Sequence, residues 1–129
     1  MNKSEIISGF NNHLCELVES LIEILPEHSD LRITAASLLS IRKFNPKLPI
    51  LTWKSYVQDK YEENIMAGNI VFFLEKDYAE DITDSNESIN ILNKIIIIKN
   101  TIKKLDKGNL DKTILYLQNL TKLCKIYFS

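Results

Sequence analysis

The sequence is poor in the residues that form tight turns. Three glycines and three prolines are spread over 129 residues, whereas an all-β domain needs a turn signal roughly every 8 to 12 residues. This shortage excludes a fold of many short strands and favours helices. The length fits one domain, residues 1–129, with a single core.

Signals for export or membrane insertion are lacking as well. Glu5, Asn11 and Asn12 interrupt the first apolar positions, so the N-terminal region does not resemble a secretory signal. No apolar run reaches the roughly 18 residues that a transmembrane helix requires. We therefore expect a cytoplasmic protein without membrane association, in which Cys15 and Cys124 remain free thiols.

Patterns that would indicate catalysis or a bound metal are also missing. The three glycines lie too far apart for a phosphate-binding loop, and no Cys–His nucleophile pair can be written. A calcium loop starting at Asp81 would need glycine where Asn86 stands and glutamate where Leu92 stands. The sequence thus predicts a protein that is not an enzyme and has no metal or cofactor. The acidic residues around this loop are interpreted as solvated and helix-capping: Glu75, Asp77, Glu80, Asp81, Asp84 and Glu87.

The residues that are present carry a helical pattern from the start of the chain. Apolar positions at spacings of three and four predict a first helix that ends before Pro26. A second helix should follow, with Ser29 or Asp30 as its N-cap and its end at Phe44 and Asn45. The positions expected inside are Ile7, Phe10, Leu14, Leu17, Leu21 and Ile24 in the first helix, and Leu31, Ala35, Leu38, Leu39 and Ile41 in the second.

The middle of the chain is predicted to hold a third helix and then a less regular stretch. Asn45 and Pro46 have the pattern of an N-cap followed by a first-turn proline. Leu48, Leu51, Trp53, Tyr56 and Val57 should face inward, and residues 61–66 continue this helix or form a short extra turn ended by Gly68. Residues 69–78 are predicted to form a short helix or an extended plug, and residues 79–88 an exposed loop.

The last forty residues predict a helical hairpin. Apolar residues from Ile89 to Leu105 line its first arm and those from Leu110 to Phe128 its second, with Gly108 as C-terminal cap and Asn109 as N-cap. The expected fold is therefore all-α, a compact bundle of five or six helices ending in an antiparallel helical hairpin.

Charge alternates in blocks along the chain. Residues 1–30 carry one lysine against six acids, whereas residues 31–58 carry five basic residues and no acid. Residues 59–87 are again acidic, and residues 88–129 have eight lysines against two acids. A formal net charge of −1 argues against long-range attraction to nucleic acid, but the blocks offer distinct docking faces.

Two sets of residues are candidate binding surfaces. Aromatic and methionine side chains are enriched at protein interfaces, although such a stretch can equally fill the core. The candidate protein interface is Trp53, Tyr56, Tyr61, Met66, Phe72, Phe73 and Tyr78. The alternative is a nucleic-acid face on the hairpin, whose lysines lack the arginines that best contact phosphate and guanine. Its candidates are Lys94, Lys99, Lys103, Lys104 and Lys107.

Several short motifs between residues 14 and 78 carry a resemblance. They are Asp30-Leu31-Arg32, Asn45-Pro46, Trp53-Lys54-Ser55-Tyr56-Val57, Tyr61-Glu62-Glu63-Asn64-Ile65-Met66 and Phe72-Phe73-Leu74-Glu75-Lys76-Asp77-Tyr78. In these the chain resembles small uncharacterised proteins of nucleocytoplasmic large DNA viruses. The resemblance implies a host cytoplasm, viral factory or virion as the setting, and it assigns no functional residue.

These observations lead to one main functional hypothesis and one alternative. The main hypothesis is a non-enzymatic protein–protein interaction or assembly component, such as a minor virion protein, that binds a protein partner or itself. The alternative is a nucleic-acid-associated factor for transcription or packaging that uses the lysine-rich hairpin. Salt dependence separates them, because phosphate contacts weaken steeply as salt rises.

Overall fold

The protein is an α-helical bundle. The computed structural model describes residues 2–75 and 88–129, and within these ranges it has helices and no strand. The helices are α1 (Lys3–Ile24), α2 (Ser29–Phe44), α3 (Leu48–Trp53), the π-helical turn η1 (Lys54–Gln58), α4 (Asp59–Met66), α5 (Val71–Glu75), α6 (Ser88–Ile102) and α7 (Lys107–Tyr127). The all-α class predicted from the sequence is confirmed.

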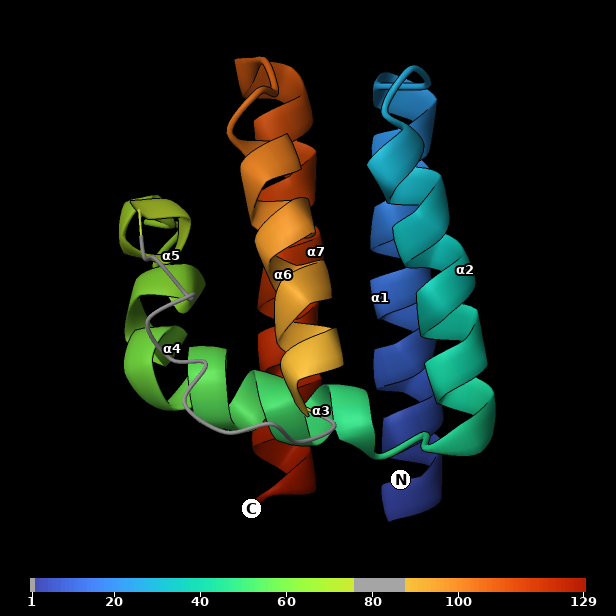
Figure 1. Cartoon of the computed structure of the whole chain (residues 1–129). Helices are drawn as coiled ribbons and strands as arrows, with labels where there is room; N and C mark the ends of the chain where they lie inside the picture. The colour runs from blue at the N-terminus through green and yellow to red at the C-terminus, as the bar shows by residue number, and fades with distance from the viewer. Residues whose placement is uncertain (1, 76–87) are drawn as a thin grey trace.

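Two pairs of long helices form the body of the bundle (Figure 1). α1 and α2 run antiparallel beside each other, α6 and α7 run in opposite directions, and the continuous run α3–η1–α4 crosses one end. α7 packs most extensively on α1, and α6 packs on α3 and α2. The two arms of the C-terminal hairpin therefore pack mainly on other helices rather than on each other. Both chain ends lie near the crossing helix.

α1 supplies the central face of the core. Phe10, Leu14, Leu17 and Leu21 are at most 4% exposed, at the spacings of three and four that the sequence predicted. The Phe10 ring meets Trp53 of α3 edge-on, with ring centroids 6.1 Å apart. This contact fixes the crossing helix against α1 at the end of the bundle.

Threonines occupy several core positions that the hydrophobic pattern does not mark. Thr52, Thr101, Thr113 and Thr121 are buried, and each hydroxyl donates to the carbonyl four residues earlier at 2.8 to 2.9 Å. Such bonds satisfy the hydroxyl inside its own helix. A buried threonine therefore presents mainly its methyl group to the core.

Some helix ends agree with the sequence predictions. α1 ends at Ile24, before Pro26, and Asn2 caps its start by accepting from the Glu5 backbone N–H at 2.8 Å. α4 ends at Met66, and Gly68 follows with φ +80°, a conformation that glycine adopts without a Cβ penalty. The short helix predicted after Gly68 is α5.

Two predicted N-caps are wrong by one or two residues. α2 begins at Ser29, so its N-cap is His28 rather than Ser29 or Asp30. Asn45 caps the C-terminus of α2 instead of starting the next helix. The third helix begins at Leu48, with Pro49 in its first turn. Asn45 does not both end α2 and start α3 in this short connection. The Asn45 backbone N–H donates to the Ile41 carbonyl, which makes Asn45 the end of α2.

The start of α7 also differs from the prediction. Asp106, rather than Asn109, is the N-cap, and its carboxylate accepts from the Asn109 backbone N–H at 2.9 Å. Gly108 lies inside the first turn and does not end α6, which stops at Ile102. A carboxylate at the N-cap accepts from an unpaired amide and interacts favourably with the positive end of the helix dipole. The N-cap therefore lies at Asp106, three residues before the predicted one.

Three apolar residues expected inside lie on the surface. Leu39 is 58% exposed, Leu51 42% and Phe128 40%. In α2 the buried positions are Leu31, Thr34 and Leu38. Leu39 lies about 100° around the helix axis from Leu38 and therefore points away from the core. Residues 79–87 of the predicted loop lie outside the described residues.

Replacing Trp53 with alanine should lower the free energy of unfolding by about 3–5 kcal/mol, because it opens a cavity beside Phe10. Urea denaturation followed by circular dichroism measures this loss. The matched control is Leu115→Ala on α7, whose side chain is 60% exposed and which should change stability by about 0.5 kcal/mol or less. Similar losses in both variants would contradict the core role of Trp53.

Candidate functional site

The predicted aromatic interface is divided between core and surface. Trp53 is 3% exposed and belongs to the core, so it is not available to a partner. Tyr56 and Tyr61 are half-buried and pack against the same core. Met66 is 38% exposed. The side chains of Phe72 and Phe73, and all of Tyr78, lie outside the described residues.

The predicted lysine face is not one continuous surface. Lys99 is only 6% exposed, and Lys94 is half-buried on α6. Lys103, Lys104 and Lys107 are exposed around the turn between α6 and α7. There the Lys104 Nζ atom lies 3.1 Å from His28 Nε2, linking this turn to the connection between α1 and α2.

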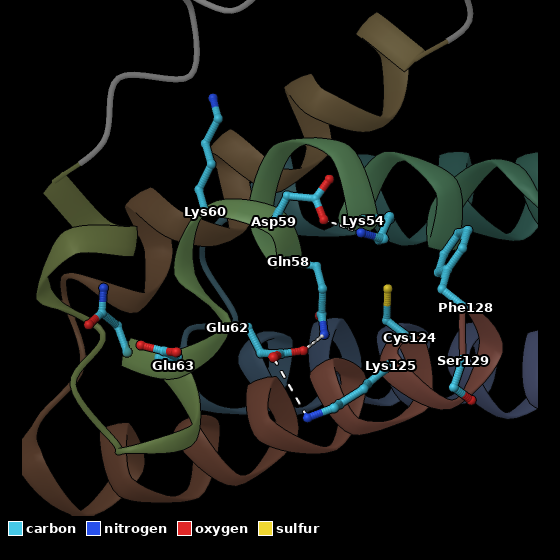
Figure 2. A pocket seen from close by; sticks show the side chains of 11 residues that line it. Lys54, Gln58, Asp59, Lys60, Glu62, Glu63, Cys124, Lys125, Phe128 and Ser129 are labelled. Atoms are coloured by element: carbon cyan, nitrogen blue, oxygen red, sulfur yellow. Dashed lines mark hydrogen bonds and ion pairs between the residues drawn. The ribbon is translucent and has the colours of Figure 1, made fainter.

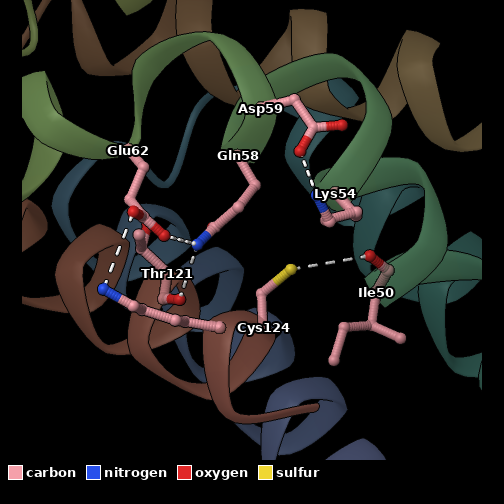
Figure 3. A network of polar contacts seen from close by, with 8 residues as sticks. Ile50, Lys54, Gln58, Asp59, Glu62, Thr121 and Cys124 are labelled. Atoms are coloured by element: carbon pink, nitrogen blue, oxygen red, sulfur yellow. Dashed lines mark hydrogen bonds and ion pairs between the residues drawn. The ribbon is translucent and has the colours of Figure 1, made fainter. Parts of the chain in front are cut away.

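The helical run from α3 to α4 contains a π-helical turn, η1. Such turns arise where an α-helix accommodates an extra residue, and they occur frequently at functional sites. Around it the Gln58 Nε2 atom donates to Glu62 Oε1 at 2.5 Å and to the Thr121 carbonyl of α7 at 3.1 Å (Figure 3). The turn is thus tied to α7 by a buried amide, which the sequence pattern did not single out.

A groove of about 620 Å³ lies between this turn, α4 and the end of α7 (Figure 2). Most of its charges are already engaged within the protein. Lys54 pairs with Asp59, and Lys125 Nζ lies 3.8 Å from a Glu62 carboxylate oxygen. The pairing with Asp59 raises the pKa of Lys54. The groove is lined by Lys54, Gln58, Asp59, Lys60, Glu62, Glu63, Asn64, Cys124, Lys125, Phe128 and Ser129.

Cys124 is the one thiol in this groove, and its surroundings make it a poor nucleophile. Burial raises its pKa to about 12, although the nearby Lys54 opposes the shift. The Cys124 Sγ atom points to the Ile50 carbonyl at 4.0 Å (Figure 3). Reactive cysteines need a lowered pKa, so Cys124 serves packing. Both Cys124 and Cys15 are free thiols, as predicted.

A second exposed feature is the outer side of α2, which we call the α2 face: Ile33, Ala36, Leu39, Lys43 and Phe44. All five are exposed, Phe44 by 81% and both Ile33 and Leu39 by 58%. The Lys43 Nζ atom lies 5.9 Å from the Phe44 ring centroid. The apolar pattern of the sequence does not reveal this surface, because it places Leu39 inside and gives Phe44 only the role of a helix end.

Most of the acidic cluster lies outside the described residues, with Glu75 as the described exception. Among residues 2–75 and 88–129, no three side chains of His, Cys, Asp or Glu gather as metal ligands. Within the same ranges no helix is long and apolar enough to cross a membrane.

Comparisons with known proteins give no relative: no family model, curated protein or solved structure matches the chain.

The two thiols should differ in reactivity. At pH 8 a thiol reagent should label the half-exposed Cys15 first, while Cys124 reacts only when the protein opens, because the thiolate is the reacting species. The single-thiol variants Cys15→Ser and Cys124→Ser separate the two rates by mass spectrometry. In urea both thiols should react at similar rates. Fast native labelling of the Cys15→Ser variant would contradict the raised pKa and burial of Cys124.

Proposed function

We propose that the protein is a non-enzymatic interaction or assembly component that binds a partner protein through the α2 face. The observation that carries this proposal is the exposure of Phe44, Leu39 and Ile33 on one outer helix. Single exposed apolar residues are common on soluble proteins, whereas a group of large ones marks an interaction surface more often. These three lie within one sixteen-residue helix.

Charge favours an acidic partner. Residues 31–58 contain five basic residues and no acid, and two exposed cations of α2, Arg32 and Lys43, are neighbours in sequence of Ile33 and Phe44. Complementary charge at the rim of an interface guides encounter and selects the partner. An amphipathic helix with acidic flanks would lay its apolar side against Phe44 and Leu39 and its carboxylates beside the cations.

Self-association through this face is the less favoured form of the same proposal. A two-fold interface places the same patch on both subunits. Two copies of the α2 face would therefore oppose cations to cations, which weakens association.

Nucleic-acid binding by the hairpin remains the alternative prediction, and no contact of the described residues favours it. The burial of Lys99 removes one of its five candidates from the surface. The viral setting likewise remains a prediction from the sequence resemblance, as does a place in the virion.

The proposal is tested with a synthetic helical peptide that has leucines on one side and glutamates on both flanks. Fluorescence anisotropy measures its binding to the full chain. Phe44→Ala combined with Leu39→Ala should weaken binding by roughly a hundredfold or more, because about 1.5–3 kcal/mol is typical for each buried large apolar side chain. Both residues are exposed, so the fold should survive the change.

Two controls make the result specific. Leu115→Ala, on the exposed side of α7, should leave the affinity unchanged, and a peptide with lysine in place of each glutamate should bind far more weakly. An affinity that the double substitution leaves unchanged would disprove the proposal. A DNA duplex that binds with steep salt dependence, in place of the peptide, would support the alternative instead.

A further inference from the structure

A second cavity lies at the end of the bundle where both termini are found. It has a volume of about 480 Å³, within the range of about 300–1,000 Å³ for small-molecule sites. The first turns of α1, the connection between α2 and α3, and the end of α7 line it. We call it the basic cavity, after Lys3, Arg42 and Lys47.

All charged side chains that line the basic cavity are cations. In the ranges covered by the structure, none of the three forms a salt bridge with a carboxylate. Lys3 instead lies over the ring of the buried Tyr127, 4.9 Å from its centroid. Among the described residues these cations therefore have no carboxylate partner, and Arg42 interacts with the thiol of Cys15.

The helix dipole explains the position of some of these cations but not of all three. Arg42 lies in the last turn of α2, where a cation is favourable. Lys3, however, is the first residue of α1, and a cation at a helix N-terminus faces the positive end of the helix dipole. Bound negative charge would offset that cost.

Asn11 gives an independent indication of a ligand. It lines the cavity and is 3% exposed, and its Nδ2 atom donates to the Pro46 carbonyl at 2.9 Å. Because the amide nitrogen is used in this way, the Oδ1 atom is fixed as an acceptor. That oxygen is buried and has no hydrogen-bond donor among the described residues. A buried acceptor without a donor costs about 1–3 kcal/mol.

We propose that the basic cavity binds a small phosphate monoester that carries a hydroxyl group. A phosphate monoester has about −1.5 to −2 charge at neutral pH, which suits three cations better than a single carboxylate does. The Arg42 guanidinium provides the planar fork that phosphate accepts. The hydroxyl would donate to Asn11 Oδ1, and the carbon skeleton would lie against Ile7 and Tyr127.

Two ligands that differ only in their hydroxyl groups test the site. Glycerol 3-phosphate and n-propyl phosphate are titrated into the full chain at constant ionic strength, with isothermal titration calorimetry as the readout. Glycerol 3-phosphate should bind about tenfold more tightly, because only it can donate to Asn11. Equal affinities would overturn the assignment of Asn11, and no saturable binding of either ester would overturn the site.

Two arginine variants on α2 distinguish a specific binding site from nonspecific electrostatic attraction. Arg42→Gln should weaken glycerol 3-phosphate binding by about tenfold or more, whereas Arg32→Gln, which removes the same charge outside the cavity, should not. Lys47 is exposed, so Lys47→Gln provides a variant that keeps the fold and should weaken binding several-fold. Equal losses in Arg32→Gln and Arg42→Gln would overturn the proposal.

Discussion

The rest of the structure depends on the way the buried face of α1 holds the crossing helix. Phe10 meets Trp53 edge-on, and this contact fixes α3 across the end of the bundle. Because α3 continues through η1 into α4, its position also brings Gln58 to the carbonyl of Thr121 on α7. A second tie, from Asn11 of α1 to the Pro46 carbonyl, holds the connection that leads into α3. One helix face therefore places both the groove beside η1 and the basic cavity.

The sequence was sufficient for the helices but not for their caps. Apolar spacing predicts a helix because it reports which side can be buried, and α1 follows it from Phe10 to Leu21. Caps depend instead on which of several competing polar side chains reaches the unpaired amides. Near α7, Asp106 does so and Asn109 does not. Nothing in the local pattern distinguishes these two choices.

The candidate sites were harder to predict because they join residues distant in the sequence. Gln58 and Thr121 meet only after the crossing helix has packed on α7. Composition also misassigned individual residues. Trp53 has the side chain of an interface residue but fills the core, and Lys99 has the side chain of a surface residue but is 6% exposed. Both outcomes depend on the rotation of one helix against its neighbours, which a single sequence does not contain.

The charge block of residues 31–58 acquires a physical meaning once it is placed on the structure. Within the last turn of α2, Arg42 lines the basic cavity while Lys43 and Phe44 belong to the α2 face. The absence of acids from the block leaves both surfaces positive. An anion held by Arg42 would lower the positive potential at Lys43, one residue away, since charges near a protein surface still interact across about one Debye length, roughly 8 Å at physiological salt. Filling the cavity would then weaken attraction of an acidic partner to the α2 face, and by linkage that partner would weaken binding in the cavity by the same factor.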